Sequence, residues 1–392
     1  MKYTFISALI FFGCEAPKNE QIPADIQHIE NLTVYSESAD VRKSIILEKG
    51  VVYGSSDDVI IGMYGEVAVD SLGRIFISNS FKKIIYVYDT EGVLVGRLGG
   101  EGRGPGEFSK WIRNLQIRNH RLYALDASMH RLNVFSLEDL SIEETISLAG
   151  NRIRYPDLAR TFPEIRNLFV RTDDSFIAEF VNHASQERTE RFENVDLQSH
   201  LYLLDSSGAI SSKLIDFIST TLTDLGIVFN LSDFFGQRLK GFSSDDKMYI
   251  ADPDHFLIKT YYPNGDYKSS FYHPIKKILL TRETAEHAGI SVLSPFGDKK
   301  DDLFEKVELP EFWPVLTSMI IDDLDRFWVA TTVEDMKVYQ WWVLENTGKV
   351  ITKFEWPRDE PIEVIKNGYM YTRQTDAETG LQQVVRYRIE MP

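Results

Sequence analysis

The sequence predicts an all-β fold, a six-bladed β-propeller of four-stranded antiparallel blades. Short runs rich in Val, Ile, Tyr and Phe alternate with turns that contain Gly, Asn or Asp, which is the pattern of strands joined into hairpins. The same order of runs and turns returns at spacings of roughly 40–50 residues, as propeller blades require. A parallel α/β sheet is not indicated because helical patterns do not alternate with the runs. A β-sandwich would not explain six copies of one order of turns.

The first blade, residues 66–100, shows the repeating unit most clearly. Its expected strands are "EVAVD" (66–70), "RIFIS" (74–78), "IIYVYD" (84–89) and "VLVGRLG" (93–99), joined by short polar turns. The other five copies are expected over residues 114–148, 167–217, 239–272, 318–356 and 362–390.

The last copy stops after its third strand, and the other end of the chain offers a replacement. Residues 42–50, "RKSIILEKG", precede the first blade and have no hairpin partner of their own. Pairing this segment with the last blade would complete its sheet, close the ring and remove an open edge. We therefore expect residues 31–392 to form one propeller domain closed by its N-terminal strand.

The N-terminus indicates export. Residues 1–13 combine Lys2, an apolar run from Phe5 to Phe12 and Gly13, and they precede Cys14, the only cysteine of the chain. This arrangement resembles a lipoprotein signal peptide, in which Cys14 would carry the lipid. We expect a polar tether over residues 14–30 and a lipid anchor in a membrane of the cell envelope, facing the periplasm or the cell surface. The alternative is a cleaved secretory signal with an incidental cysteine.

Charge excludes one class of partner. The chain has 43 Lys and Arg against 59 Asp and Glu, a formal net charge of -16. Nucleic-acid binding needs a basic surface, so nucleic acid is not expected as a partner.

Two stretches carry a family resemblance. "GEVAVDSLGRIFISNS" (65–80) and the linker "GGEGRGPGEF" (99–108) resemble an NHL-type repeat. "EFWPVLTSMIIDDLDRFWVATT" (311–332) resembles the later blades of six-bladed propeller lipoproteins common in Bacteroidota-type bacteria. The resemblance implies the fold but no particular activity, because propellers host binding, scaffolding and several kinds of catalysis.

Connection lengths separate the two faces of the ring. Turns between the first and second strands, and between the third and fourth, are short and share one face. The long connections all fall on the other face, at residues 100–113, 150–166, 181–200, 219–238 and about 273–317. The last one contains a short helix around Thr281–Ala288. Long loops in a compact domain are usually functional, so this long-loop face is the predicted binding surface.

The long loops hold basic and aromatic candidates for binding carboxylates or acidic glycans. Arginine binds such anions through two parallel hydrogen bonds. The candidates are Trp111, Arg113, Arg152, Arg154, Tyr155 and Arg160. In the alternative interpretation, these arginines are solvated and pair with nearby acidic side chains.

Two further sets follow the second strand of several blades. His130, His183 and His255 would project at the long-loop face, where imidazoles can hold a metal, act as a general base or contact a ligand. Asn79, Asp126 and Asp252 could place oxygen ligands around calcium or another divalent ion. The alternative is that these Asx side chains only start turns. No other cofactor is indicated.

These observations favour a non-catalytic function. We expect the long-loop face to bind a peptide, glycan or protein partner. The first alternative is a hydrolase, lactonase or lyase at the channel mouth, and the second is a structural subunit of an envelope complex. Neither a Gly-x-Ser-x-Gly elbow nor a His-Glu-x-x-His motif occurs in the chain.

Overall fold

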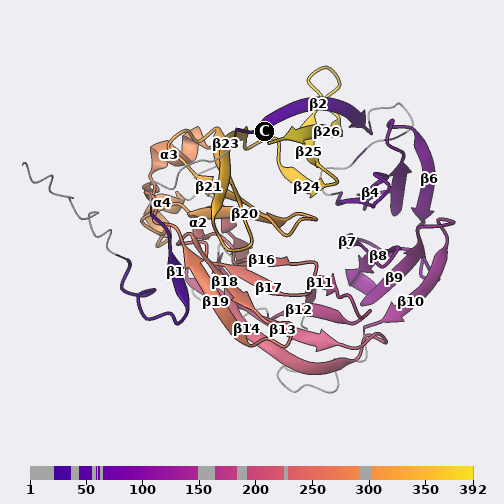
Figure 1. Ribbon diagram of the computed structural model, residues 1–392, viewed down its shortest axis with the longest axis horizontal. Coiled ribbons are helices and arrows are strands. Elements are labelled where there is room, and N and C mark those ends of the chain that lie inside the picture. Colours follow the sequence, from indigo (N-terminus) through magenta and orange to yellow (C-terminus); the bar gives the residue numbers. More distant parts are fainter. Residues whose placement is uncertain are drawn as a thin grey trace, which may run out of the picture.

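The computed structural model describes residues 22–36, 44–54, 59, 61, 65–148, 164–182, 192–224, 228–290 and 302–391. These residues form six sheets arranged in a ring around a central axis, and each sheet has an antiparallel four-stranded core (Figure 1). The protein is a six-bladed β-propeller, and the predicted fold class is confirmed.

Blades 1, 2 and 5 are simple four-stranded meanders. The strands of each blade are given in order from the innermost to the outermost. Blade 1 contains β3 (Val67–Val69), β4 (Ile75–Asn79), β5 (Ile84–Tyr88) and β6 (Leu94–Gly99). Blade 2 contains β7 (Ile112–Arg118), β8 (Arg121–Asp126), β9 (Arg131–Ser136) and β10 (Ile142–Ser147). Blade 5 contains β20 (Leu316–Ile321), β21 (Phe327–Thr332), β22 (Val338–Leu344) and β23 (Val350–Pro357).

Blades 3, 4 and 6 carry additions to this plan. Blade 3 contains β11 (Glu164–Val170), β12 (Phe176–Asn182), β13 (Asn194–Leu204), β14 (Ile210–Asp224) and a fifth strand, β15 (Val228–Asn230). Blade 4 contains β16 (Leu239–Phe242), β17 (Met248–Ala251), β18 (Leu257–Tyr261), β19 (Tyr267–Tyr272) and β1 (Leu32–Val34). Blade 6 contains β24 (Ile362–Lys366), β25 (Tyr369–Thr375), β26 (Gln382–Glu390) and β2 (Ile46–Tyr53).

The ring closes as predicted, through a strand from the N-terminal part of the chain. β2 runs antiparallel to β26, from the pair Ile46–Glu390 to the pair Tyr53–Val384, and Figure 1 shows the two strands side by side. Tyr53 is fully buried and packs in one cluster with Tyr371 and Val384. Closure therefore removes an open sheet edge and also buries apolar side chains between blades 6 and 1.

The segment before the closing strand packs on blade 4. β1 pairs in parallel with β19, and Ile26 is only 3% exposed against Leu257 and Tyr272. The polar tether expected to reach residue 30 therefore ends earlier, because residues 22–30 are docked on the propeller. The predicted signal peptide, residues 1–13, lies outside the described residues.

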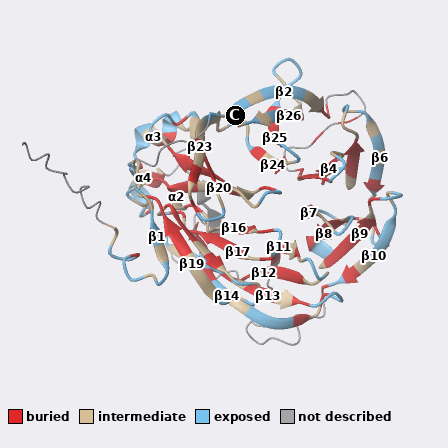
Figure 2. Ribbon diagram, in the orientation of Figure 1, coloured by how far each residue is buried: buried red, intermediate tan, exposed pale blue. Residues whose placement is uncertain are grey.

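Burial follows the order of the strands in each blade. The second strands β4, β8 and β21 are almost wholly buried, whereas much of the outermost strands β6 and β10 is exposed (Figure 2). Apolar clusters join neighbouring blades, for example Phe76 of blade 1 with Leu122 of blade 2. The blades are therefore packed face to face, which makes the inner strands a rigid frame for the channel.

Strand extends into two expected loops of blade 3. β13 begins at Asn194 and β14 continues to Asp224, so parts of 181–200 and 219–238 are strand and not loop. Polar cross-strand pairs stabilise the extension: Thr221 donates to Asp196, and Thr223 donates to Asn194. Leu197 of the extension is buried with Leu222 and Val181, so the extended pair also has a small apolar cluster of its own.

Three short helices form a small cap on the long-loop face. They are α2 (Ser232–Phe235), α3 (Arg282–His287) and α4 (Leu303–Lys306), which Figure 1 groups at one side of the ring. α3 confirms the predicted helix, and the Thr281 side chain caps it by accepting from the N–H of Thr284. A separate apolar core holds the cap together: Leu231, Phe234, Leu280, Ala285, Leu303, Val307, Trp313 and Met336. No helix in the described residues has the length and apolar character needed to cross a membrane.

Candidate functional site

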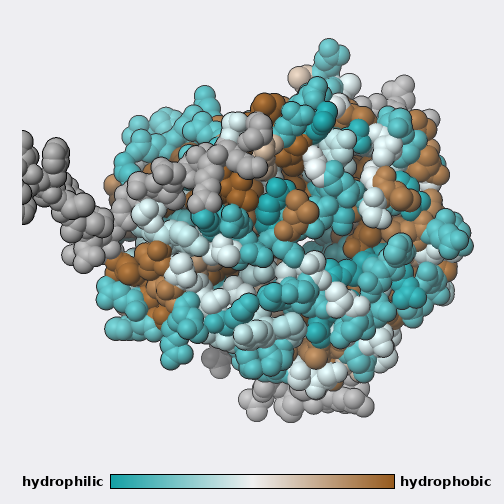
Figure 3. All heavy atoms as spheres, viewed as in Figure 1, coloured by the Kyte–Doolittle hydropathy of each residue, from teal (hydrophilic) through white to brown (hydrophobic). Residues whose placement is uncertain are grey.

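The six inner strands line a central channel. Residues of β3, β7, β11, β16, β20 and β24 surround a cavity of about 620 Å³. Hydrophilic side chains surround the middle of the face seen in Figure 3. Since the inner strands all run in the same direction, one mouth is built from their first residues and the long loops, and the other mouth from their last residues and the short turns.

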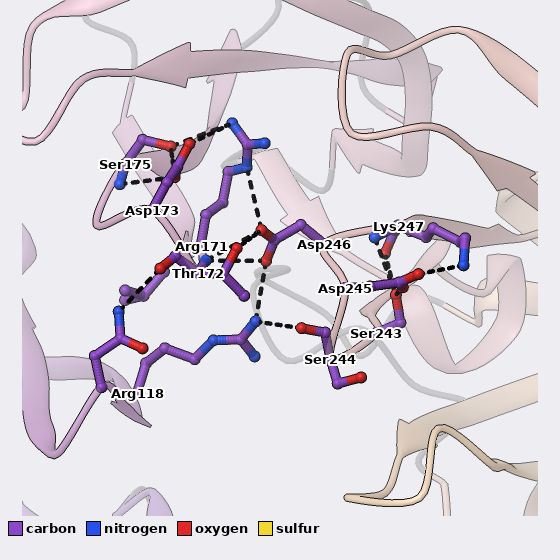
Figure 4. Close-up of polar contacts among 12 residues, drawn as sticks. Arg118, Arg171, Thr172, Asp173, Ser175, Ser243, Ser244, Asp245, Asp246 and Lys247 are labelled. Atoms are coloured by element: carbon purple, nitrogen blue, oxygen red, sulfur yellow. Dashed lines mark hydrogen bonds and ion pairs between the residues drawn. The ribbon is translucent and has the colours of Figure 1, made fainter.

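The short-turn mouth is tied together by a polar network (Figure 4). Asp246 of blade 4 is 6% exposed and accepts hydrogen bonds from Arg118 of blade 2 and Thr172 of blade 3. Ser244 donates to Asp325 of blade 5, which extends the network around the ring. These side chains satisfy one another, so this mouth has a structural role.

The long-loop mouth is shaped by β-bulges. The inner strands of blades 2, 3, 5 and 6 each contain a register shift near their first residues. A bulge places an extra residue on one strand and turns its side chain away from the regular pleat. The extra residues include Asn114, Arg166, Thr317 and Glu363. All four line cavities, so the same local irregularity supplies polar groups from four blades.

A cavity of about 470 Å³ opens at this mouth between blades 1, 2 and 3, and we call it the mouth pocket. Its lining residues are Glu66, Ser80, Trp111, Ile112, Arg113, Asn114, Arg166 and Asn167. Trp111 is 41% exposed, and Phe81 meets it edge to face with ring centroids 6.3 Å apart. The pocket thus combines two guanidinium groups, one carboxyl group and an exposed aromatic rim.

Glu66 is the acidic group of the mouth pocket. Its carboxylate accepts a hydrogen bond of 2.7 Å from the backbone N–H of Leu115, which joins blade 1 to blade 2. Burial raises the pKa of Glu66, and the negative charge of Glu363 adds to the effect, although backbone N–H groups and Arg113 oppose it. With two guanidinium groups against one carboxyl group, the lining of the pocket is net positive.

The charged groups beside the pocket are paired. Lys240 lies 2.8 Å from Glu179, which is fully buried and also accepts from Ser199. Burial disfavours the charged form of Glu179, but Lys240 and the hydrogen bonds outweigh it and hold its pKa below the usual range. Arg373 pairs with Glu363 at 2.8 Å. Among the described residues, the lining of the mouth pocket itself contributes the guanidinium groups of Arg113 and Arg166.

Comparison with known proteins supports the fold. A family model described as a 6-bladed beta-propeller, DUF5128, matches residues 29–156. That match spans the N-terminal strands and the first two blades. A search of curated proteins finds no match.

Two solved structures from Bacteroides have the same overall fold. One is a protein described as exported, from Bacteroides fragilis, with 12% identity and a TM-score of 0.51 over 92% of this chain and 99% of that chain. The other is a member of the DUF4221 family from Bacteroides vulgatus, with 8% identity and a TM-score of 0.53 over 90% of this chain and 99% of that chain. At these identities the likeness concerns the propeller fold alone, and the resemblance to lipoproteins and NHL-type repeats stays a prediction.

The predicted ligand-binding residues are only partly described. Trp111 and Arg113 both line the mouth pocket, and their role in binding stays a prediction. Arg152, Arg154, Tyr155, Arg160, His183 and Cys14 lie outside the described residues, and their roles stay predictions.

The two described histidines lie apart from the mouth pocket. His255 places its Nε2 atom 3.0 Å from Asp25 of the docked N-terminal segment. His130 has a positive φ of 49° and ends the short 3-10 helix Ala127–Met129. Neither lines the mouth pocket, so the expected convergence of imidazoles at one ligand does not include these two.

The predicted divalent-ion ligands are engaged in turns. Asn79 accepts from the N–H groups of Phe81 and Lys82. Asp126 accepts from both the N–H and the hydroxyl of Ser109. Such contacts agree with the alternative interpretation, in which these side chains stabilise turns and loops of the chain.

Asp252 is engaged in the same way, since its side chain accepts from Asp254 and Arg238. No group of three or more His, Cys, Asp or Glu residues is placed to hold a metal ion anywhere in the described part of the chain. A divalent-ion site at Asn79, Asp126 and Asp252 stays a prediction.

Sequence reasoning misses Glu66 and Asn114. Glu66 lies at the boundary of a predicted strand and reads as an ordinary exposed residue. Asn114 has a positive φ of 49° inside a predicted strand, and the Asn residue is the single local signal of the bulge.

Proposed function

We propose that this protein is an exported, lipid-anchored binding protein that recognises a carboxylate-bearing glycan at the mouth pocket. One observation carries the proposal: Arg113 and Arg166 share a cavity with Trp111, whose ring is exposed beside that of Phe81.

Each group has a role in such recognition. The arginines can donate paired hydrogen bonds to a carboxylate, and the aromatic rim can cover the apolar face of a sugar ring. The two guanidinium groups outnumber the single carboxyl group of Glu66, whose pKa is raised by burial. In a chain of net charge -16, a local positive pocket also gives an anion a defined place to dock.

The membrane location rests on the N-terminal sequence. If Cys14 carries the lipid, seven residues lie between it and Ile22, the first residue described on the propeller side, so eight residue steps join the two. Eight extended residues span at most roughly 28 Å. A lipid at Cys14 would therefore hold blade 4, where the docked segment packs, near the membrane surface.

Fractionation tests the anchor independently of ligand binding. We expect Cys14→Ser to move the protein from the membrane fraction to the soluble fraction, whereas wild type stays with the membrane. Equal membrane association of the two proteins would contradict the lipoprotein assignment.

Calorimetric titration tests the ligand. The probes are a trimer of galacturonic acid and the neutral galactose trimer, added to protein that lacks the lipid. We expect binding of the acidic trimer alone, and Arg113→Ala or Arg166→Ala should weaken it at least about tenfold, since a hydrogen bond to a charged group contributes about 1.5–3 kcal/mol.

Arg97→Ala is the matched control for both arginines. Arg97 lies exposed on β6, the outer strand of blade 1, away from the mouth pocket. Equal binding of acidic and neutral trimers, or equal loss of affinity in all three variants, would refute the proposal.

One observation favours an enzyme as the second candidate. Glu66 combines a raised pKa with a position in the mouth pocket beside Arg113, and such a carboxyl group can act as a general acid or base. A hydrolase or lyase would convert the bound glycan, and Glu66→Gln would abolish turnover while leaving binding. Absence of any product from the acidic trimer after prolonged incubation would count against this candidate.

A further inference from the structure

A second cavity lies between the helical cap and blade 5, apart from the mouth pocket. Its volume is about 240 Å³. Its walls come from α2 and from Ile290, three residues past the end of α3, on the cap side, and from β20, β21 and β22 on the blade side. A cavity of this size suits a small molecule and not a polymer.

Arg358 supplies the positive charge of this cavity. Its guanidinium lies 4.3 Å from the ring centroid of Tyr339, and its Nε–H donates to the carbonyl oxygen of Val338 at 3.1 Å. Its Nη2 contacts the sulfur atom of Met336 at 3.2 Å. These contacts fix the orientation of the guanidinium before any ligand arrives, which lowers the entropic cost of binding.

No acidic side chain neutralises Arg358 directly. Among the described residues, no carboxylate oxygen lies within 4.0 Å of its guanidinium nitrogens. Burial lowers the pKa of Arg358, but an arginine remains charged in a protein. A partly buried cation with only a carbonyl and a thioether as hydrogen-bond partners is an incomplete site for a small anion.

Asp233 faces the same cavity from the cap. It lies in α2 and is close enough to Arg358 and Tyr339 to interact with both electrostatically, but it makes no ion pair with Arg358. The cavity therefore presents one negative and one positive group with a gap between them. A ligand that carries both charges would satisfy both groups.

The rest of the lining is mixed: Gln237, Thr317 and Thr332 are polar and stand beside an apolar wall. The apolar wall consists of Leu239, Ile290, Trp313, Pro314 and Leu316. A small site with apolar walls and a few oriented polar groups is typical of specific small-molecule binding. We therefore expect the ligand to carry an apolar substituent that packs against this wall.

We propose that this cavity binds a free α-amino acid with an apolar side chain, such as leucine. Arg358 holds the α-carboxylate, Asp233 holds the α-ammonium group, and the apolar wall receives the side chain. A simple fatty acid would leave Asp233 facing an uncharged chain, and a simple amine would leave Arg358 unpaired. This site does not depend on the glycan proposed for the mouth pocket.

Titration calorimetry with three related probes tests the proposal on wild-type protein. The probes are leucine, 4-methylpentanoate, which lacks the amine, and leucinamide, which lacks the carboxylate. We expect leucine to bind at least tenfold more tightly than either of the other two. Lack of leucine binding at millimolar concentration, or equal binding of all three probes, would overturn the proposal.

Substitutions that remove one charge at a time test which side chain binds which group of the ligand. We expect Asp233→Asn to weaken leucine binding at least tenfold and to leave 4-methylpentanoate binding unchanged. Asp335→Asn is the control, because Asp335 also interacts with Arg358 electrostatically but does not line the cavity. Equal effects of the two substitutions would overturn the assignment.

Arg358→Gln should abolish binding of both leucine and 4-methylpentanoate. Because Arg358 also packs on Tyr339, this variant is compared with wild type by thermal melting before the titration. The exposed Asp233 does not carry that risk, so the Asp233→Asn result decides the proposal if Arg358→Gln fails to fold.

Discussion

Arg118 of blade 2 donates a hydrogen bond of 3.0 Å to Asp246 of blade 4, so two blades that are not neighbours in the ring are joined at the short-turn mouth. Asp246 also accepts from Thr172 of blade 3, which lies between them. Three blades thus share one buried carboxylate. This network occupies the mouth opposite the mouth pocket, so stability and ligand binding are assigned to opposite ends of the channel.

Removing that carboxylate should destabilise the fold. Asp246→Ala would leave the backbone N–H of Thr172 without its acceptor and would leave Arg118 bonded to the carbonyl oxygen of Ser244, and a buried group without its partner costs about 1–3 kcal/mol. Chemical denaturation measures the free energy of unfolding. Asp245→Ala is the control in the same turn: Asp245 is exposed and pairs with Lys247, so its loss should cost less than about 1 kcal/mol. Equal costs would contradict the structural role of the network.

Ring closure by β2 can be tested by two truncations. A chain that begins at residue 44 lacks β1 but keeps β2, and we expect it to unfold cooperatively. A chain that begins at residue 54 exposes the edge of β26 and removes Tyr53 from its cluster, so we expect a loss of cooperative melting or aggregation. Similar melting temperatures for the two chains would show that β2 is dispensable.

His273 should make stability fall in mild acid. Burial lowers its pKa to about 4 from the usual 6.5, and its Nε2–H donates to the carbonyl oxygen of Gly348 at 2.8 Å. The folded state therefore keeps His273 neutral, whereas the unfolded chain takes up a proton below about pH 6.5. Above pH 6.5 the neutral His273 therefore makes its full contribution to the free energy of unfolding. That contribution falls by about 3 kcal/mol as the pH drops from 6.5 towards 4.

The substitution His273→Asn removes the titrating group and keeps a donor. We expect the variant to be less stable than wild type at pH 7 but to show a flatter decline between pH 6.5 and 4. Unfolding free energies measured across this range provide the check. Parallel curves for the two proteins would mean that other groups cause the decline.

Trp111 should contribute to ligand binding through its exposed ring. We expect Trp111→Ala to weaken binding of the galacturonic acid trimer roughly fivefold, since a favourable ring contact is worth about 1 kcal/mol. Leu324→Ala removes an apolar group that is 68% exposed on a short turn at the opposite face, and it should leave affinity unchanged. An unchanged affinity in Trp111→Ala would show that the aromatic rim does not contribute to binding.

The strand order could be predicted because each blade is a local structure. Its hairpins are short, and Gly, Asn and Asp residues mark turns such as "SLG" (71–73) in the sequence. The closing strand was predictable because a propeller cannot leave its last sheet open. The helix α3 was predictable from its cap at Thr281.

The candidate site could be predicted only in part. Trp111 and Arg113 were found because they lie in a long basic loop on the face that carries such loops. Asn114 was missed because a bulge leaves little trace in a sequence, and Glu66 because its contact with Leu115 joins two different blades. The pairing of Asp246 with Arg118 was also invisible, since their blades are not adjacent along the chain.

The sequence by itself determined the repeating strands, their turns, the closure of the ring and the face that bears the elaborate connections, because these depend on local patterning and on the need to pair every edge. Only the tertiary structure decided which side chains meet. Residues about 50 positions apart in the chain, such as Glu66, Arg113 and Arg166, become neighbours because the ring brings the first residues of successive inner strands together around one axis.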